Sequence, residues 1–362
     1  MEQIYYKITN QAECHHGYQY VDGLNVLDKP FEPTGSCVVG GLYFTTAKYI
    51  FKFLIYGCYL REITLPSDCQ WVQDPARDKF RADKIILGKK YDLIDPLTFQ
   101  LLIEKGANIH TDNDYALKWA VEHGYLQVVK WLVENGADIH AANDYALRRA
   151  AKNGHLEVVK LLIKSDANIR ASNDYALRRA AKNGHLEIVE LLIENGANVC
   201  ASNDYALRQT AKNGHLKVIK LLIKSGANIH ADDNYALRIA SENEYFEIVK
   251  CLVEAGADIH ADDDFALRYA SKKGCLEIVQ LLIESGADIH ARNDYALQWA
   301  STGNYLEIVQ LLIEKGANIY VANNYAFKIA LQNGHSEIVK LLIENAKLFT
   351  DVNYALKLCH QK

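Results

Sequence analysis

The fold of this chain is decided by the sequence AANDYALRRAAKNGHLEVVKLLIKSDANIR at residues 141–170, which recurs with substitutions along most of the molecule. Within it, the segment NDYAL begins at Asn143, and copies or close variants of that segment return at steps of 30 residues. They begin at Asn113, Asn173, Asn203, Asp233, Asp263, Asn293 and Asn323. Self-similarity at a fixed period of this length predicts a solenoid, in which each repeat covers its neighbours.

Each repeat is expected to hold two helices. In residues 141–170 we expect the first over Tyr145 to Lys152, with Asp144 as its N-cap, because a carboxylate can accept the free N–H groups of a first helical turn. Asn153-Gly154 makes the turn between the helices. The second is expected over Leu156 to Ser165, and its polar residues form one narrow stripe. A helix this apolar must be covered on both flanks, as a stack of repeats would do.

The run AAKNGHLEVVKLLI at 150–163 resembles the ankyrin repeat, and so does GANIHA at 226–231. YALR at Tyr145–Arg148 replaces the family's usual TPLH, and the period is 30 residues where the family has about 33. Aligning both flanks puts the missing residues between Ala141 and Leu147, where ankyrin proteins form a projecting β-hairpin. The resemblance therefore implies a mainly α, ankyrin-type helical solenoid with shortened hairpins. YALR repeats of this length resemble the ankyrin families of mimivirus-like giant DNA viruses.

The chain divides by texture into a small N-terminal domain and the solenoid. Residues 1–88 alternate short aromatic and β-branched runs with turns, which predicts a small α+β domain of unknown role. The solenoid is expected over 89–361, as a half unit at 89–110, eight 30-residue units over 111–350 and a capping helix at 351–361. Asp95-Pro96 suits the start of the first helix, since Asp is a frequent N-cap and Pro a frequent first helical residue.

Within residues 1–88 one helix is expected from Thr45 to Tyr56. Three segments resemble the leader domain of the same giant-virus family, namely HGYQY at 16–20, GSCVVGGLYF at 35–44 and GCYLRE at 57–62. The candidate strands are Ile4–Ile8, Gly17–Val21, Gly41–Phe44, Tyr59–Thr64, Trp71–Gln73 and Lys84–Leu87.

Composition excludes few function classes. The chain has 49% hydrophobic and 23% charged residues and a net charge of -5, so charge alone nominates no partner. Its eight cysteines show no C-x-x-C spacing and are interpreted as reduced intracellular thiols. The most apolar run, Tyr49 to Leu60, is too short to cross a bilayer, so no membrane partner is expected. The giant-virus resemblance favours the host cytoplasm, with the virion and the nucleus as alternatives.

No catalytic residue, metal ligand set or cofactor motif is predicted. Cys14-His15-His16 are three adjacent side chains, which rarely converge on one ion, and Cys37 does not lie at a zinc-finger spacing. The glycines at 35, 40 and 41 match neither dinucleotide-binding nor phosphate-loop patterns. A histidine column is assigned a structural role, because packed helices lie about 8–10 Å apart, too far for one ion. It comprises His110, His140, His230, His260 and His290.

Three columns of residues on the first helix, which lines the concave face in ankyrin folds, carry the functional signal. The first, the arginine column, is nearly constant and is expected to be structural, through pairs such as Asp144 with Arg148 at i, i+4. It comprises Lys118, Arg148, Arg178, Arg208, Arg238, Arg268, Gln298 and Lys328. The next, the variable column, changes freely among Trp, Arg, Gln, Ile and Tyr, and the third column is mostly basic. The variable column comprises Trp119, Arg149, Arg179, Gln209, Ile239, Tyr269, Trp299 and Ile329. We take the variable column and the basic residues beside it as candidate partner contacts: Trp119, Arg149, Lys152, Arg179, Lys182, Gln209, Lys212, Ile239, Tyr269, Trp299 and Ile329.

These columns favour a protein-protein interaction scaffold or adaptor. The giant-virus resemblance implies that it holds one or more host or viral proteins in an infected host cell. A cationic centre with aromatic residues toward both ends would suit an acidic protein segment. The alternative is that these are ordinary solvated helix faces. Two other classes stay open: an enzyme whose activity lies in residues 1–88 and whose repeats select its target, and nucleic-acid binding through the basic columns. The sequence leaves the oligomeric state unknown.

Two residues break the pattern of the turn between the helices. Glu244 and Asn304 stand where other repeats have Gly154, Gly184 and Gly214. Because such turns use a left-handed backbone, we expect a positive φ at both residues, which costs a side chain with a Cβ about 1–2 kcal/mol.

Overall fold

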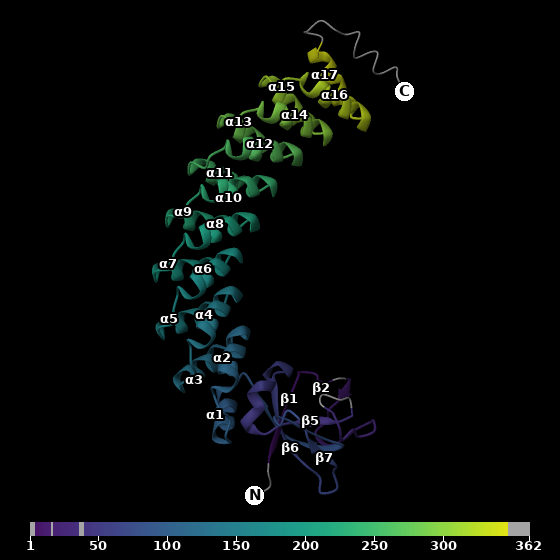
Figure 1. The fold of residues 1–362 in the computed structure, drawn as a ribbon, viewed down its shortest axis with the longest axis vertical. Coiled ribbons are helices and arrows are strands. Elements are labelled where there is room, and N and C mark those ends of the chain that lie inside the picture. Colours follow the sequence, from purple (N-terminus) through teal and green to yellow (C-terminus); the bar gives the residue numbers. More distant parts are fainter. Residues whose placement is uncertain (1–3, 16, 36–39, 347–362) are drawn as a thin grey trace. The chain divides into compact units, whose positions relative to one another are not determined.

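The computed structural model describes residues 4–15, 17–35 and 40–346 (Figure 1). It divides into two compact parts, Met1–Ala176 and Leu177–Lys362. The first holds the N-terminal sheets and the first repeats, and the boundary falls inside helix α6 (Ala171–Lys182). The predicted capping helix at 351–361 lies outside the described residues.

The N-terminal domain is built from antiparallel sheets. One sheet has the strand order β1-β6-β9-β4, a second has the order β5-β8-β7, and β2 pairs with β3 as a hairpin. The strands are β1 (Tyr5–Thr9), β2 (Cys14–His15), β3 (Tyr18–Gln19), β4 (Gly23–Val26), β5 (Leu42–Phe44), β6 (Tyr59–Thr64), β7 (Trp71–Gln73), β8 (Phe80–Ala82) and β9 (Lys84–Asp92).

The predicted α+β class of this domain is confirmed, with additions. All six predicted strands are found, and the predicted helix is a 3₁₀-helix, η1 (Ala47–Tyr56). Strands β2, β4 and β8 were not predicted, because they are only two to four residues long and carry few β-branched side chains. Strand β9 continues to Asp92, four residues beyond the expected end of the domain at 88.

Aromatic rings and one buried arginine hold the domain together. Tyr5 packs edge-on against Phe44 and Phe80, with ring centroids 5.0 and 5.5 Å away. Arg81, 1% exposed, donates hydrogen bonds of 2.8–2.9 Å to the carbonyl oxygens of residues 32, 34 and 35. Its guanidinium also lies 3.6 Å from the buried Asp74 carboxylate. A long loop is thereby tied to strand β8, and its backbone oxygens are satisfied away from water.

A row of rings joins the sheets to the first repeat. Phe51 of η1 stacks on Phe99 of helix α1 (Pro96–Glu104), and Phe99 packs against Trp119, at centroid distances of 5.7 and 6.2 Å. Helix α1 begins as predicted, because the Asp95 side chain accepts the Leu97 N–H at 3.0 Å and Pro96 follows it. The N-terminal domain is therefore part of one packed body with the first repeats.

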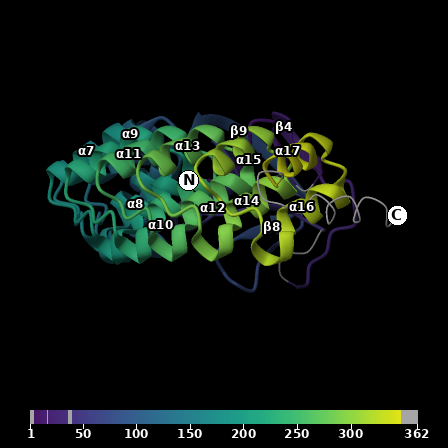
Figure 2. The same ribbon diagram turned by 90° about the horizontal axis from the view of Figure 1, so that it is seen from above.

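The repeats are stacked helix pairs, which confirms the predicted solenoid class (Figure 1). Within the second part, Figure 2 shows the first helices in one row and the second helices in another. The first helices are α2 (Thr111–His123), α4 (Ala141–Asn153), α6, α8 (Ala201–Asn213), α10 (Ala231–Glu242), α12 (Ala261–Lys273), α14 (Ala291–Thr302) and α16 (Val321–Asn333). The second helices are α3 (Leu126–Glu134), α5 (Leu156–Lys164), α7 (Leu186–Glu194), α9 (Leu216–Lys224), α11 (Phe246–Glu254), α13 (Leu276–Glu284), α15 (Leu306–Glu314) and α17 (Ser336–Ala346).

A left-handed turn stands where ankyrin proteins have a hairpin. Ala142, Asn143 and Asp144 have φ of 53°, 60° and 52°, and the equivalent residues of the other described repeats do the same. No strand occurs between residues 96 and 346, so the predicted shortening of the hairpins is confirmed. Each left-handed residue with a Cβ costs about 1–2 kcal/mol, less for Asn and Asp. The strained turn therefore needs compensating bonds.

The prediction that Asp144 caps its own helix is wrong. An N-cap has extended backbone, whereas Asp144 is left-handed and its carboxylate points to the next repeat. There it accepts the backbone N–H of Asn168 at 2.7 Å, and the His140 ring nitrogen Nδ1 lies 3.0 Å away. The same bond, across 24 residues, is made in turn by Asp114, Asp204, Asn234, Asp264 and Asp294. This side chain links adjacent repeats.

The arginine column is structural, but the expected partner is wrong. The Arg148 guanidinium does not pair with Asp144; it donates to the carbonyl oxygens of Ala142 and Asn143, both at 2.8 Å. Because a left-handed turn leaves these oxygens without helical partners, the arginine caps the turn. Arg208, Arg238 and Arg268 bind the two equivalent carbonyls in their repeats.

The expected positive φ at the irregular turns is confirmed, with 66° at Glu244 and 63° at Asn304. We predict that Glu244→Gly stabilises the chain by about 1 kcal/mol, because it removes this strain. Asn304→Gly should gain less, since Asn tolerates the conformation better. Chemical denaturation of the full chain measures both. A loss of stability in Glu244→Gly would mean that the contact of Glu244 with the Cys275 thiol outweighs the strain.

Candidate interaction surface

The described first helices place the candidate contact residues in five different settings. Trp119 is not available to a partner, because it is 4% exposed and packs against Phe99, His123 and Tyr125. Its prediction as a contact residue is wrong. Its position at the junction with the N-terminal domain explains the large ring, since this first helix is covered where later ones are not.

Arg149 and Lys152 lie on α4 in the first part. The Arg149 Nε donates to the Tyr145 hydroxyl at 2.8 Å and lies 3.3 Å from the Glu122 carboxylate of the preceding repeat. Tyr145 also donates to Glu122. The residue at i−4 of Arg149 is Tyr145, so its own helix offers no carboxylate there, and the carboxylate partner comes from the adjacent repeat. The Arg149 side chain is 34% exposed, and its pairing with Glu122 limits the positive charge that it presents to a partner.

In the second part, the basic residues lie near the start of the stack. Arg179 Nη1 lies 3.4 Å from the Tyr205 hydroxyl, with its guanidinium 5.9 Å from the centre of that ring. Lys182 and Gln209 are half-buried and Lys212 is exposed. Arg179 and Lys182 lie three residues apart on α6, as Gln209 and Lys212 do on α8, so each pair shares one face of its own helix.

Two aromatic members of the variable column come together around a lysine. The Lys272 Nζ lies 4.3 Å from the centre of the Trp299 ring and 5.2 Å from that of Tyr269. Tyr269 in turn stacks on Phe265 with centroids 3.9 Å apart. We call Tyr269, Lys272 and Trp299 the aromatic cluster. Its side chains are half-buried, so a partner can cover the part of each ring that solvent still reaches.

Lys272 joins the candidate contact residues on the basis of the structure. It lies three residues after Tyr269 on the same helix, and this spacing places both on one face. That signal was available in the sequence, whereas the approach of Lys272 to Trp299 from the next repeat was not.

The two remaining candidates, Ile239 and Ile329, are half-buried apolar side chains on α10 and α16.

Acidic residues of the left-handed turns offset part of the basic charge. Arg208 binds Asp232 at 3.0 Å and Arg238 lies 3.4 Å from Asp262, each carboxylate belonging to the following repeat. The arginine guanidiniums also lie over aromatic rings, as Arg238 does over Phe265 at 5.4 Å. The arginine column is thus occupied by internal contacts, which leaves the variable column and its basic neighbours as the changeable surface.

The other sequence candidates add no chemical site in the described residues. No three His, Cys, Asp or Glu side chains there gather as metal ligands would, and His16 and Cys37 lie outside the description. The histidine column makes bonds within the turns, as His260 does with Asp264 at 3.1 Å. No helix in the described part is long and apolar enough to cross a membrane.

Comparison with known proteins identifies the repeats as ankyrin repeats. Two models of ankyrin repeats match the chain, one of three copies over 207–293 and 267–354, the other of many copies over 117–163, 147–193 and 177–223. Relatives include two ankyrin repeat proteins of Acanthamoeba polyphaga mimivirus. They are 47% and 41% identical over 35% and 36% of this chain, which covers 65% and 47% of their own lengths. An uncharacterized protein of the same virus is 44% identical, over 35% of this chain and 95% of its own length.

Proposed function

This chain belongs to the ankyrin repeat family, and we propose on that premise that it is a scaffold or adaptor that holds other proteins. Ankyrin repeats mediate protein–protein interaction, and proteins built from them are in general interaction scaffolds without enzymatic activity. The relatives from a giant virus support the further proposal that the chain acts in an infected cell.

One observation carries the proposal. The half-buried side chains of the variable column differ from repeat to repeat, whereas the residues that build the repeats are nearly constant. The arginine column, the left-handed turns and the links such as Asp204 to Asn228 account for the repeated residues. None of these bonds requires the change from Gln209 to Tyr269 to Trp299 in the variable column. Because packing does not explain why the residue types of the variable column differ, we interpret the differences as adaptation to partner proteins.

The chemistry of this face supports an acidic protein segment as the partner. In the second part, Lys182 and Lys212 supply positive charge, and the aromatic cluster supplies rings with a cation between them. Aromatic and arginine side chains are frequent carriers of binding energy at interfaces, while basic groups speed the arrival of an acidic partner. On α4 of the first part, Arg149 and Lys152 offer the same chemistry in weaker form, because Glu122 offsets Arg149.

We expect the double change Tyr269→Ala and Trp299→Ala to weaken partner binding by about thirtyfold, the loss of about 2 kcal/mol that marks a hot spot. The full chain would capture partners from infected-cell lysate after nuclease treatment, and the affinity of each purified partner would then be measured by calorimetry. Lys272→Glu should weaken binding most at low salt.

Tyr320→Ala is the matched control, because Tyr320 is an exposed ring outside the variable column. It should change the affinity by less than about twofold. Melting curves of all variants show whether each chain remains folded. Equal binding by the double variant and the wild type would refute the proposed surface, and loss of every partner on nuclease treatment would favour nucleic-acid binding.

A further inference from the structure

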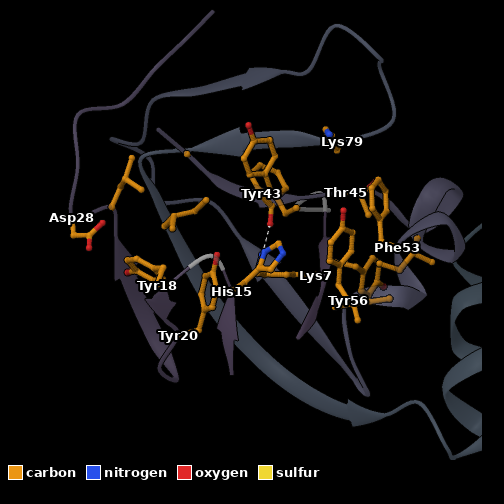
Figure 3. Close-up of a pocket in the computed structure, with 18 of the residues that line it drawn as sticks. Lys7, His15, Tyr18, Tyr20, Asp28, Tyr43, Thr45, Phe53, Tyr56 and Lys79 are labelled. Carbon is orange, nitrogen blue, oxygen red and sulfur yellow. Dashed lines mark hydrogen bonds between the residues drawn. The ribbon is translucent and has the colours of Figure 1, made fainter. Parts of the chain in front are cut away.

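The N-terminal domain contains a cavity of about 430 Å³ with aromatic walls (Figure 3). In that view Lys7 and His15 lie between Tyr18 and Tyr20 on one side and Phe53 and Tyr56 on the other. A volume of this size, walled by aromatic rings and holding polar groups such as Lys7, is typical of small-molecule sites. The lining residues come from β1, β2, β3, β5 and η1 and from the loops between them, residues 27–29 included.

Lys7 lines this cavity and is 5% exposed. Its Nζ donates one hydrogen bond of 2.9 Å to the Tyr43 carbonyl oxygen and lies 4.5 Å from the centre of the Tyr20 ring. An ammonium group has three donors, and the described contacts use one. A buried ammonium that lacks a carboxylate partner is costly, which makes Lys7 an unusual side chain to keep in a pocket.

The acidic groups around Lys7 are committed elsewhere or lie at the rim. Arg61 stands opposite Lys7 in the β1–β6 register, and it takes Glu13 and Asp22 as its partners. Burial raises the pKa of Tyr6, Tyr18 and Tyr20, so these phenols stay neutral and supply no negative charge. The titratable and charged groups that line the cavity or face Lys7 are Tyr6, His15, Tyr18, Tyr20, Asp28, Lys29, Tyr43, Tyr56, Arg61 and Lys79, with exposed Asp28 as the carboxylate in the lining.

We propose that this cavity binds a small aromatic carboxylate, whose rings stack on the tyrosine walls and whose anion pairs with Lys7. The carboxylate of the ligand gives Lys7 the negatively charged partner that the chain itself does not provide. The aromatic walls give offset or edge contacts to a flat ring system. This site is independent of the repeat surface, so it can succeed or fail whatever the partners of the repeats are.

The affinity of the cavity for an aromatic carboxylate should depend on pH. Burial lowers the pKa of Lys7 to about 7, so about half of the molecules carry the ammonium form at neutral pH. A carboxylate binds that charged form. Affinity is therefore full below pH 7 and falls as the pH rises through it, by about tenfold between pH 6 and pH 8.

Calorimetric titration of the full chain with 2-naphthoate and with the neutral alcohol 2-naphthalenemethanol tests the site. At pH 6 we expect the carboxylate to bind at least about tenfold more tightly than the alcohol, with the stated loss by pH 8. Lys7→Met should bind both compounds alike and lose the pH dependence. Equal binding of the two compounds by the wild type, or no binding of the carboxylate at millimolar concentration, would overturn the proposal. So would a pH dependence that persists in Lys7→Met, since its source would be another group such as His15.

Discussion

Gly57→Ala is expected to lower the free energy of unfolding of the N-terminal domain by about 3 kcal/mol, the upper range for an overpacked site. Gly57 joins η1 to β6, and its backbone presses on β1. A Cβ at this residue would lie 2.5 Å from the Asn10 nitrogen and closer still to the Thr9 carbonyl group. Both are backbone atoms of a paired strand end, so no side chain can move aside. Denaturant titration followed by tyrosine and tryptophan fluorescence measures the loss.

Gly88→Ala is the matched control for Gly57→Ala. Gly88 lies in β9 of the same sheet, where an added Cβ would meet the Glu62 Cβ at an ordinary 3.5 Å. We expect a change within about 0.5 kcal/mol, as for most exposed positions. If Gly57→Ala is as stable as Gly88→Ala, η1 does not approach β1 as closely as described. The cavity between these elements would then need revision too.

Asp204→Ala should lower the stability of the repeat array by about 3 kcal/mol. The buried Asp204 carboxylate accepts the Asn228 N–H of the next repeat at 2.7 Å, and its loss leaves that N–H without its partner, at about 1–3 kcal/mol. Alanine also tolerates the left-handed φ of 52° less well than aspartate does. Because repeats depend on their neighbours, thermal and chemical unfolding of the full chain report the loss.

The variant Asp204→Asn removes the negative charge of this side chain but keeps an oxygen that can accept the Asn228 N–H. The chain already uses Asn234 in the same role, where its side-chain oxygen accepts the Asp258 N–H at 2.9 Å. We expect Asp204→Asn to cost less than about 1 kcal/mol, because the acceptor and the left-handed tolerance are both kept. A large loss in the asparagine variant would show that the negative charge, and not the bond between repeats, is what the position requires.

The sequence predicts the repeat architecture because a 30-residue period admits few structures. Helix ends such as Leu156 and turns such as Asn153-Gly154 are local features, and they are found where expected. The direction of Asp144 is not local: its partner, Asn168, lies in the next repeat, and a left-handed backbone turns the carboxylate toward it. A rule for isolated helices therefore assigns the wrong partner.

The same distinction divides the candidate contact residues. The change of residue type from repeat to repeat identifies the variable column. Only the packing in the structure shows that Trp119 is buried against Phe99 of helix α1. Arg149 meets Glu122 across a repeat, which its i−4 residue could not indicate. Lys7 gave no sequence signal, because a lysine in a strand becomes unusual only when its burial and lack of a carboxylate are known.

Oxidative footprinting of the full chain, with and without a captured protein partner, tests the central claim most directly. Hydroxyl radicals modify tyrosine and tryptophan side chains that solvent reaches, so Tyr269 and Trp299 report on the proposed surface and Tyr320 serves as an internal reference. We expect the partner to protect Tyr269 and Trp299 and to leave Tyr320 unchanged. Protection of the second helices or of the N-terminal sheets, with Tyr269 and Trp299 still reactive, would contradict it.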